Sequence, residues 1–170
     1  VASERGIQVL PLGRGDVDLL SSNAGVALTD ALEPDDALVA AAAIAPVRDI
    51  AMLQRNLTII SAIATAIESS SLSHIVNIGS DAVYADSPRS LNESSGLGPA
   101  SLHGIMHLTR ELVLNEAAGD VPFATLRPTL IYGLDDPHNG YGPNRFRRLA
   151  GAGEDIVLFG EGEERRDHIS

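Results

Sequence analysis

The chain has 170 residues, 44% of them hydrophobic, which is enough for one domain with its own core. Its formal net charge of −11 argues against nucleic acid or an anionic membrane as its main partner. Cysteine is absent, which excludes disulfides and thiol chemistry, and all 12 basic residues are arginine. The apolar runs at 37–47 and 57–67 are too short to span a bilayer, and no signal peptide opens the chain, so we expect a cytoplasmic protein.

The first part of the chain combines short apolar runs with one long amphipathic segment. Residues 6–13 predict a buried strand that ends at glycine, and residues 16–20 predict a second, very short strand. The apolar run 36–46, which ends at Pro46, is typical of a parallel strand covered on both faces. Apolar residues recur at helical spacing through 47–70, which predicts a long helix.

The second part continues the same alternation. Residues 74–80 predict another buried strand, 86–99 a loop by composition, and 101–118 a helix. The run 122–133 predicts the next strand of the sheet.

Beyond residue 133 the chain becomes richer in arginine, glycine and polar loop, with a helix predicted over 144–151 and a strand from about 155. Strands that alternate with helices predict an α/β fold, a Rossmann-like doubly wound parallel sheet. We expect residues 1–133 to form this domain and residues 134–170 to begin a small substrate-binding lobe.

Four sequence blocks follow one another in a recognisable order: NIGSDAVYAD, SLHGIMHLTRE, LRPTLIYG and GPNRFRRLAGAGEDIVLFGEGEERRDHI. Together they resemble the extended short-chain dehydrogenase/reductase superfamily, and within it the NAD-dependent epimerase/dehydratase family. The resemblance covers roughly residues 7–170. It implies an oxidoreductase or isomerase that uses NAD or NADP and acts on a nucleotide sugar or a related sugar.

Ser80 matches the family's serine, which lies at a strand end and bonds the reacting oxygen of the substrate. Related dehydratases follow this serine with an Asp-Glu pair that acts as acid and base. Here Asp81 is present, but Ala82 follows it, so the resemblance supports a dehydratase mechanism only in part. The plainer alternative is that Ser80 only completes its own turn.

His103 and His107 stand where the family has the tyrosine and lysine of its Tyr-x-x-x-Lys motif. Three hypotheses remain open. His103 could exchange protons, since an imidazole titrates near about pH 6.5, while His107 bonds the cofactor ribose. The pair could instead belong to a catalytically silent protein that binds a dinucleotide or sugar nucleotide. Two histidines one turn apart can also hold a metal, although the metalloprotease pattern needs glutamate where Gly104 stands.

The glycine-rich turn that binds the cofactor pyrophosphate is missing from this chain. Residues 13–18 and 160–165 each contain G-x-G, but neither segment links a first strand to a helix. The family's motif would lie before residue 1, so we expect an N-terminally truncated chain.

Further matches imply cofactor contacts, and each has a plainer structural alternative. Arg14 follows a predicted strand at which NAD-specific members carry an acid, and its charge would suit the 2′-phosphate of NADP. Ala41 and Ala42 fall where small residues let the cofactor lie against the backbone. The resemblance adds three more cofactor positions: Asn56, Pro128 and Thr129.

The substrate residues implied by the resemblance lie near the C-terminal end of the sequence. Arg166 in RRDHI matches an arginine that grips the substrate pyrophosphate, and a guanidinium suits phosphate oxygens. Asn144 and Arg145 fall where family members contact the nucleotide. Family members also commonly pair through two long helices, which would make this chain a homodimer through 47–70 and 101–118.

Overall fold

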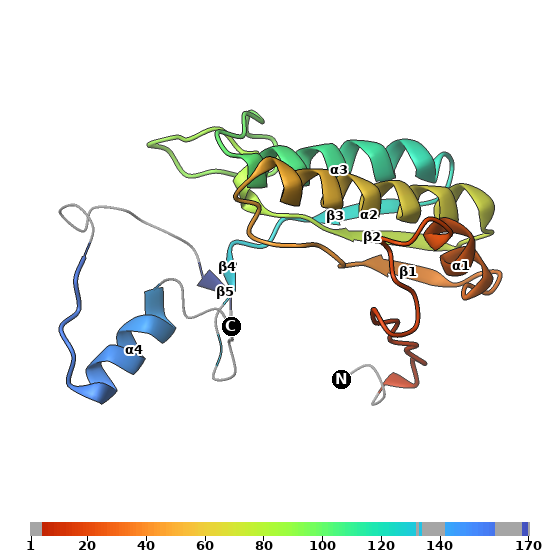
Figure 1. Cartoon of the computed structure of the whole chain (residues 1–170). Coiled ribbons are helices and arrows are strands. Elements are labelled where there is room, and N and C mark those ends of the chain that lie inside the picture. The colour runs from red at the N-terminus through yellow and green to blue at the C-terminus, as the bar shows by residue number, and fades with distance from the viewer. Residues whose placement is uncertain (1–4, 132, 134–141, 159–167, 170) are drawn as a thin grey trace. The chain divides into compact units, whose positions relative to one another are not determined.

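The computed structural model describes residues 5–131, 133, 142–158 and 168–169 (Figure 1). The chain forms two compact units, Val1–Leu126 and Arg127–Ser170. This division comes earlier than the boundary at residue 133 that the sequence suggests.

The first unit is built on a parallel sheet of three strands, β1 (Ala37–Ala40), β2 (His74–Ile78) and β3 (Phe123–Leu126). Strand β2 lies in the middle, with Ala37 of β1 opposite His74 and Phe123 of β3 opposite Ile75. The three strands run parallel and are connected through helices. The predicted α/β fold is therefore confirmed.

Two long helices, α2 (Ile50–Ser69) and α3 (Leu102–Ala118), lie side by side over one face of this sheet (Figure 1). A short helix, α1 (Ala24–Asp30), packs against α2. Their inward side chains share one core cluster with the strands, which includes Ile63, Ile75, Met106 and Leu114.

The polar residues before the two long helices explain where they start. The side chain of Asp49 accepts the Met52 N–H at 2.8 Å, and that of Ser101 accepts the Gly104 N–H at 3.1 Å. Both are N-caps that satisfy a free amide of the first turn. The helices predicted over 47–70 and 101–118 are confirmed, each starting a little later than predicted.

By length and composition alone, helix α2 is long and apolar enough to cross a membrane. Its apolar run 57–67, taken by itself, is too short to do so. Eight of its residues are buried, and it packs against α1 and α3. The core helix of an α/β unit has the same composition, because it is covered on several sides.

The strands predicted over 6–13 and 16–20 are wrong. Residues 7–13 have no strand partner in the described part of the chain, and Val9 and Leu10 are 63% and 68% exposed. Without a neighbour to pair its amides and carbonyls, an apolar run does not form a strand. The following residues form a turn closed by Gly13, whose carbonyl accepts the N–H of Asp16 at 3.0 Å.

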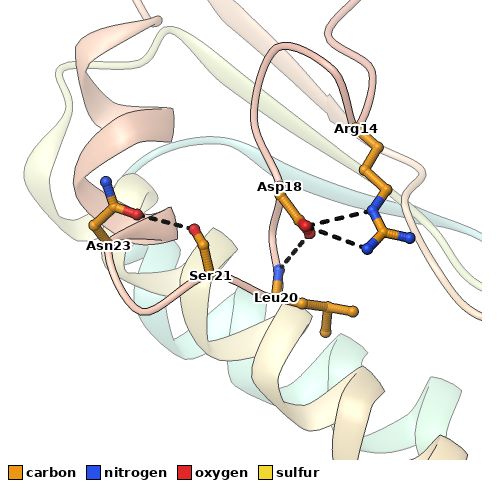
Figure 2. Close-up of polar contacts among 5 residues, drawn as sticks. All are labelled: Arg14, Asp18, Leu20, Ser21 and Asn23. Carbon is orange, nitrogen blue, oxygen red and sulfur yellow. Dashed lines mark hydrogen bonds and ion pairs between the residues drawn. The ribbon is translucent and has the colours of Figure 1, made fainter.

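Helix α1 was not predicted from the sequence. Figure 2 shows the polar residues before it: Asp18 accepts the Leu20 N–H at 3.1 Å, and the Ser21 hydroxyl donates to Asn23 at 3.0 Å. Asn23 is the N-cap residue, but its side chain makes no capping bond. The turn chemistry of 18–23 was the available signal for a helix start.

Two other predicted strands are longer than the observed ones. The run 36–46 gives only the four residues of β1, and Val39 is 60% exposed, so in the described part of the chain this strand is not covered on both faces. The run 122–133 gives β3 and then, after Pro128, a separate strand. Proline lacks the N–H that a continuous ladder requires.

The second unit contains that separate strand, β4 (Leu130–Ile131), paired in parallel with β5 (His168–Ile169). Its helix, α4 (Gly142–Ala152), confirms the one predicted over 144–151. Residues 154–158 form no strand, contrary to the prediction, and the following part of that prediction lies outside the described residues.

Candidate active site

Ser80 and Asp81 form the turn that follows the central strand. After β2 ends, the Gly79 N–H still donates to the Leu126 carbonyl at 2.7 Å, which holds the strand end in place. Ser80 then caps a single 3₁₀ turn, η2 (Asp81–Val83): its hydroxyl accepts the Ala82 N–H at 3.2 Å and donates to the Asp81 carboxylate at 3.3 Å. Ser80 thus has a turn role, and both side chains remain partly exposed.

Gly104 lets helix α3 approach this turn closely. A Cβ atom at Gly104 would overlap the carbonyl oxygen of Ala82 and lie 2.7 Å from Cβ of Pro99. Glycine is therefore required at this contact, since the obstacle is main chain. The contact brings the first turn of α3, with His103, against the turn that carries Ser80 and Asp81.

His103 is half-buried, and the chain fixes one of its nitrogens. The Val47 N–H donates to Nδ1 of His103 at 3.5 Å, a long bond. A nitrogen that accepts carries no proton, so the neutral ring holds its proton on Nε2. Burial lowers the pKa of His103, and the nearby Asp81 carboxylate partly opposes this shift.

His107 lies one turn further along and is only 6% exposed. Its ring meets that of His103 edge to face, with centroids 4.7 Å apart and planes at 87°. Burial lowers the pKa of His107 to about 4, with smaller contributions from His103 and from the charge of Arg110. Within the described residues its Nδ1 has no hydrogen-bond partner. Both imidazoles are therefore uncharged near neutral pH.

The described residues contain no group of three or more histidine or acidic side chains arranged to hold a metal ion. The histidine pair on α3 would by itself supply only two ligands, and structural zinc sites use four.

Asn56 fixes the loop between β1 and α2. This buried side chain accepts the Ile44 N–H at 2.9 Å, donates to the Ile44 carbonyl at 3.0 Å, and donates to the Met52 carbonyl at 2.9 Å. The loop carries the exposed residues Ala41 and Ala42 on one side of Ile44 and Val47 on the other. Asn56 therefore positions the main chain on which the His103 contact depends.

Arg110 is a residue of this region that sequence reasoning missed. It is 1% exposed, and its guanidinium donates to the Asn77 side chain at 2.7 Å and to the carbonyls of Ala40 and Ala42, each at 2.6 Å. The signal was present in the sequence, since Arg110 lies in register with Met106 and Leu114 on the buried stripe of α3.

Arg14 lies in an exposed turn (Figure 2). It pairs with Asp18 at 3.2 Å, and its side chain is 75% exposed. The pKa of Asp18 is lowered, first by the Leu20 amide and then by the Arg14 guanidinium.

The remaining predicted residues belong to the second unit. Pro128 and Thr129 precede β4, and the Thr129 hydroxyl is buried without a partner in the described part of the chain. On α4, Asn144 is buried and Arg145 is exposed. Arg166 lies outside the described residues.

The comparisons with known proteins agree with the fold described above. A model of the NAD dependent epimerase/dehydratase family matches residues 3–170, whereas a search of curated proteins gives no match. Among solved structures, UDP-N-acetylglucosamine 4-epimerase from Bacillus cereus is 24% identical with a TM-score of 0.82, over 98% of this chain and 60% of the epimerase.

Two further structures are similar to this chain. UDP-glucose 4-epimerase from Thermotoga maritima, with UDP-glucose, is 20% identical with a TM-score of 0.76, over 89% of this chain and 52% of that one. The dTDP-glucose 4,6-dehydratase from Streptomyces venezuelae, with NAD bound, is 23% identical with a TM-score of 0.70. The match covers 85% of this chain and 47% of the dehydratase. The chain thus spans about half the length of these enzymes.

At such identities the structural likeness establishes the fold alone. The family match covers nearly all of the sequence, and it agrees with the parallel sheet and with the four sequence blocks. This chain belongs to the NAD-dependent epimerase/dehydratase family, within the extended short-chain dehydrogenase/reductase superfamily.

Proposed function

We propose that the protein carrying this chain is an NAD-dependent epimerase, dehydratase or reductase of a nucleotide sugar, with proton exchange at His103. The observation that carries the proposal is the approach of helix α3 to the turn after β2, with Gly104 against Ala82. It groups a hydroxyl, a carboxylate and an imidazole at the carboxyl end of the central strand. Open α/β sheets bind their ligands at this edge.

The residues at this edge fit a nicotinamide cofactor. Nδ1 of His107 is buried without a partner among the described residues, so it can accept a bond from a ribose hydroxyl. Ala41 and Ala42 are exposed and small, so they leave the main chain open to a flat ligand. When bound, NAD accepts a hydride from the substrate and can return it. Pro128 and Thr129 are further candidate contacts of the cofactor.

The protein's own residues would handle the substrate oxygen and its proton. The Ser80 hydroxyl is partly exposed and can hydrogen-bond the reacting oxygen. His103 is neutral near pH 7, as a proton acceptor must be. In the tautomer that the Val47 bond implies, Nε2 carries a proton and can donate it in a hydrogen bond. Taking up a proton at Nδ1 requires only that the long bond from Val47 be given up.

The second candidate is a catalytically silent member that binds the dinucleotide or sugar nucleotide without turnover. The Val47 bond to His103 favours this alternative. Nδ1 already accepts the Val47 N–H, and Nε2 already carries a proton, so neither nitrogen is ready to take a proton from a substrate. In such a protein, His103 and His107 would serve only as hydrogen-bonding groups.

Several residues complete the proposal. Asn144, Arg145 and Arg166 are candidate contacts of the nucleotide diphosphate, for which arginine forks are suited. Arg14 is the candidate for recognising the 2′-phosphate if NADP is used. Asp81 is a candidate acid or base beside Ser80.

We also propose a cytoplasmic homodimer formed through α2 and α3. Leu57, Ile105 and Leu112 leave 41%, 42% and 62% of their surface exposed on these helices, and a paired copy would cover them. Leu112→Glu would then shift the protein to monomer in sedimentation velocity, whereas an unchanged sedimentation coefficient would contradict the dimer.

The decisive experiment combines cofactor binding with product analysis. Binding of NAD and of UDP-glucose, UDP-N-acetylglucosamine and dTDP-glucose is measured by calorimetry, and conversion of these sugars is followed by chromatography and by nicotinamide absorbance. Turnover that is lost in His103→Ala supports the enzyme. NAD or nucleotide-sugar binding without turnover of any of these sugars supports the silent member. Binding of neither NAD nor any of these nucleotide sugars contradicts both.

A matched control is His74→Ala, which removes an imidazole at the opposite end of the central strand. This variant should keep both binding and turnover. Loss of turnover in His74→Ala would mean that the His103→Ala result reports damage to the fold.

A further inference from the structure

Arg110 is a buried cation whose partners all lie at one edge of the sheet. Its three hydrogen bonds reach Asn77 near the end of β2, Ala40 at the end of β1, and Ala42 just beyond. They are short, between 2.6 and 2.7 Å, as expected of charge-assisted bonds. One side chain thereby joins helix α3 to two strand ends.

Within the described part of the chain, Arg110 forms no ion pair. Its partners are two carbonyls and an amide oxygen, none of which carries a formal charge. Burial lowers the pKa of Arg110 to about 10, so the guanidinium still stays charged at neutral pH. A buried charge without a counter-ion is costly, and an apolar side chain of similar size would avoid this cost.

The position of this charge links it to the candidate active site. Arg110 lies one turn after His107 on the same face of α3, and its charge acts on the His107 imidazole. Its main-chain partners are the carbonyls of Ala40 and Ala42, on either side of Ala41. Ala41 and Ala42 are the residues proposed to lie against the cofactor. Arg110 itself is too buried to touch a ligand, so any effect passes through these neighbours.

We propose that Arg110 is the positioning residue of the candidate site: its bonds fix the main chain at Ala40–Ala42, and its guanidinium, one turn after His107, opposes a second positive charge at that imidazole. The inference rests on the proposed function only in taking these two features as cofactor contacts. The fixed main chain and the neutral imidazole are properties of the protein without ligand.

Few charged or titratable groups influence the pKa of His107. On its own helix they are His103 and Arg110, and the Asp81 carboxylate of the preceding turn acts on His103. The neighbouring strand ends offer Asn77 and main-chain carbonyls, and helix α2 contributes no charged group to the His107 shift. Changing Arg110 therefore removes the one permanent positive charge from this set.

Three variants separate the charge from the hydrogen bonds. Arg110→Lys keeps the charge and loses the planar fork. Arg110→Met removes both. Asn77→Asp leaves the guanidinium bonded but puts a carboxylate beside it, so it offsets the charge and keeps the contact. Since Asn77→Asp and Arg110→Lys each retain polar partners, the test does not depend on whether Arg110→Met folds.

The charge is read from the titration of His107 by NMR in the protein without cofactor, with the signal assigned through His107→Gln. In Asn77→Asp and Arg110→Met the midpoint should rise by about half a unit or more, a threefold change in proton affinity. In Arg110→Lys it should stay near the unaltered value. An unchanged midpoint in Asn77→Asp and Arg110→Met overturns the electrostatic role, because a purely structural arginine would not affect it.

The hydrogen bonds are read from amide exchange over residues 40–44, also without cofactor. Arg110→Lys and Arg110→Met should exchange about tenfold faster there, and Asn77→Asp should not. Equal exchange in all variants overturns the positioning role. Failure of the proposed function would look different: the unaltered protein would bind no NAD, while the titration and exchange results followed the expected order.

Discussion

Helices α2 and α3 lie side by side over the same sheet, yet they bury different side chains (Figure 1). Helix α2 buries seven apolar residues and one polar residue, Asn56. Helix α3 buries His107 and Arg110 in its middle, among the apolar residues Met106, Leu114 and Ala118. The difference teaches that α2 mainly builds the core, whereas α3 also carries residues of the candidate site, so stability and candidate site can be disturbed separately.

The largest effect is expected from a cavity under α2. Ile63 is 3% exposed and belongs to the core cluster, so Ile63→Ala should lower the free energy of unfolding by about 2–5 kcal/mol. Denaturant unfolding followed by circular dichroism measures the change. Ile50→Ala is the matched control on the same helix, because Ile50 is 60% exposed, and it should cost less than about 1 kcal/mol. Equal losses in the two variants would refute the assignment of the core.

On α3 the corresponding test is acidification. The folded-state pKa of His107 is about 4, below the ordinary value of 6.5, so the unfolded chain takes up the proton first. The neutral His107 ring therefore contributes to the free energy of unfolding in full above about pH 6.5. This contribution, about 3 kcal/mol in all, is lost as the pH falls towards 4. His103, whose pKa is also lowered, acts in the same direction.

The control for this pH dependence is His107→Gln, which cannot take up a proton. Unfolding measured at a series of pH values should show a flatter acid limb for this variant than for the unaltered protein. Parallel limbs would mean that other groups cause the acid sensitivity, and that His107 is not held neutral by its surroundings.

A smaller effect on stability, but a direct one on the site, is expected from Gly104→Ala. The new Cβ meets the Ala82 carbonyl, so α3 must move away from the turn, at a cost of about 1–3 kcal/mol. The same movement separates His103 from Ser80, and turnover should fall by a larger factor than stability explains. Gly96→Ala is the control, since a Cβ there meets nothing within 4 Å. Full turnover by a folded Gly104→Ala protein would contradict the site.

Much of the fold could be predicted from the sequence, because periodicity reports burial. The helical spacing of apolar residues through 47–70 led to a helix that the structure confirms, and the helix predicted over 101–118 is confirmed as well. The prediction failed at 6–13, where apolar composition alone was taken for a strand although pairing requires a neighbour. It also failed at β1, where a run of alanines does not reveal which of its residues enter the ladder.

The candidate site could be predicted only where one residue matched one motif position. The pairing of Ser80 with Asp81 follows from adjacency, but the Val47 amide on His103 joins residues 56 positions apart. No local pattern contains such a contact. Arg110 illustrates the same limit: its place on the buried stripe was visible, whereas its three partners depend on how α3 packs over two strands.

The smallest effect on stability is expected at Arg14, whose side chain is 75% exposed. Its pair with Asp18 is exposed, and such pairs contribute little, so Arg14→Ala should leave the unfolding midpoint unchanged (Figure 2). If Arg14 recognises a 2′-phosphate, the same variant should weaken NADP binding about tenfold and leave NAD binding intact. Asp18→Asn sharpens the test, because it releases the guanidinium and should strengthen NADP binding. Calorimetry with both cofactors decides: equal changes for NAD and NADP would make Arg14 a surface residue of the turn, since only the phosphate distinguishes the two ligands.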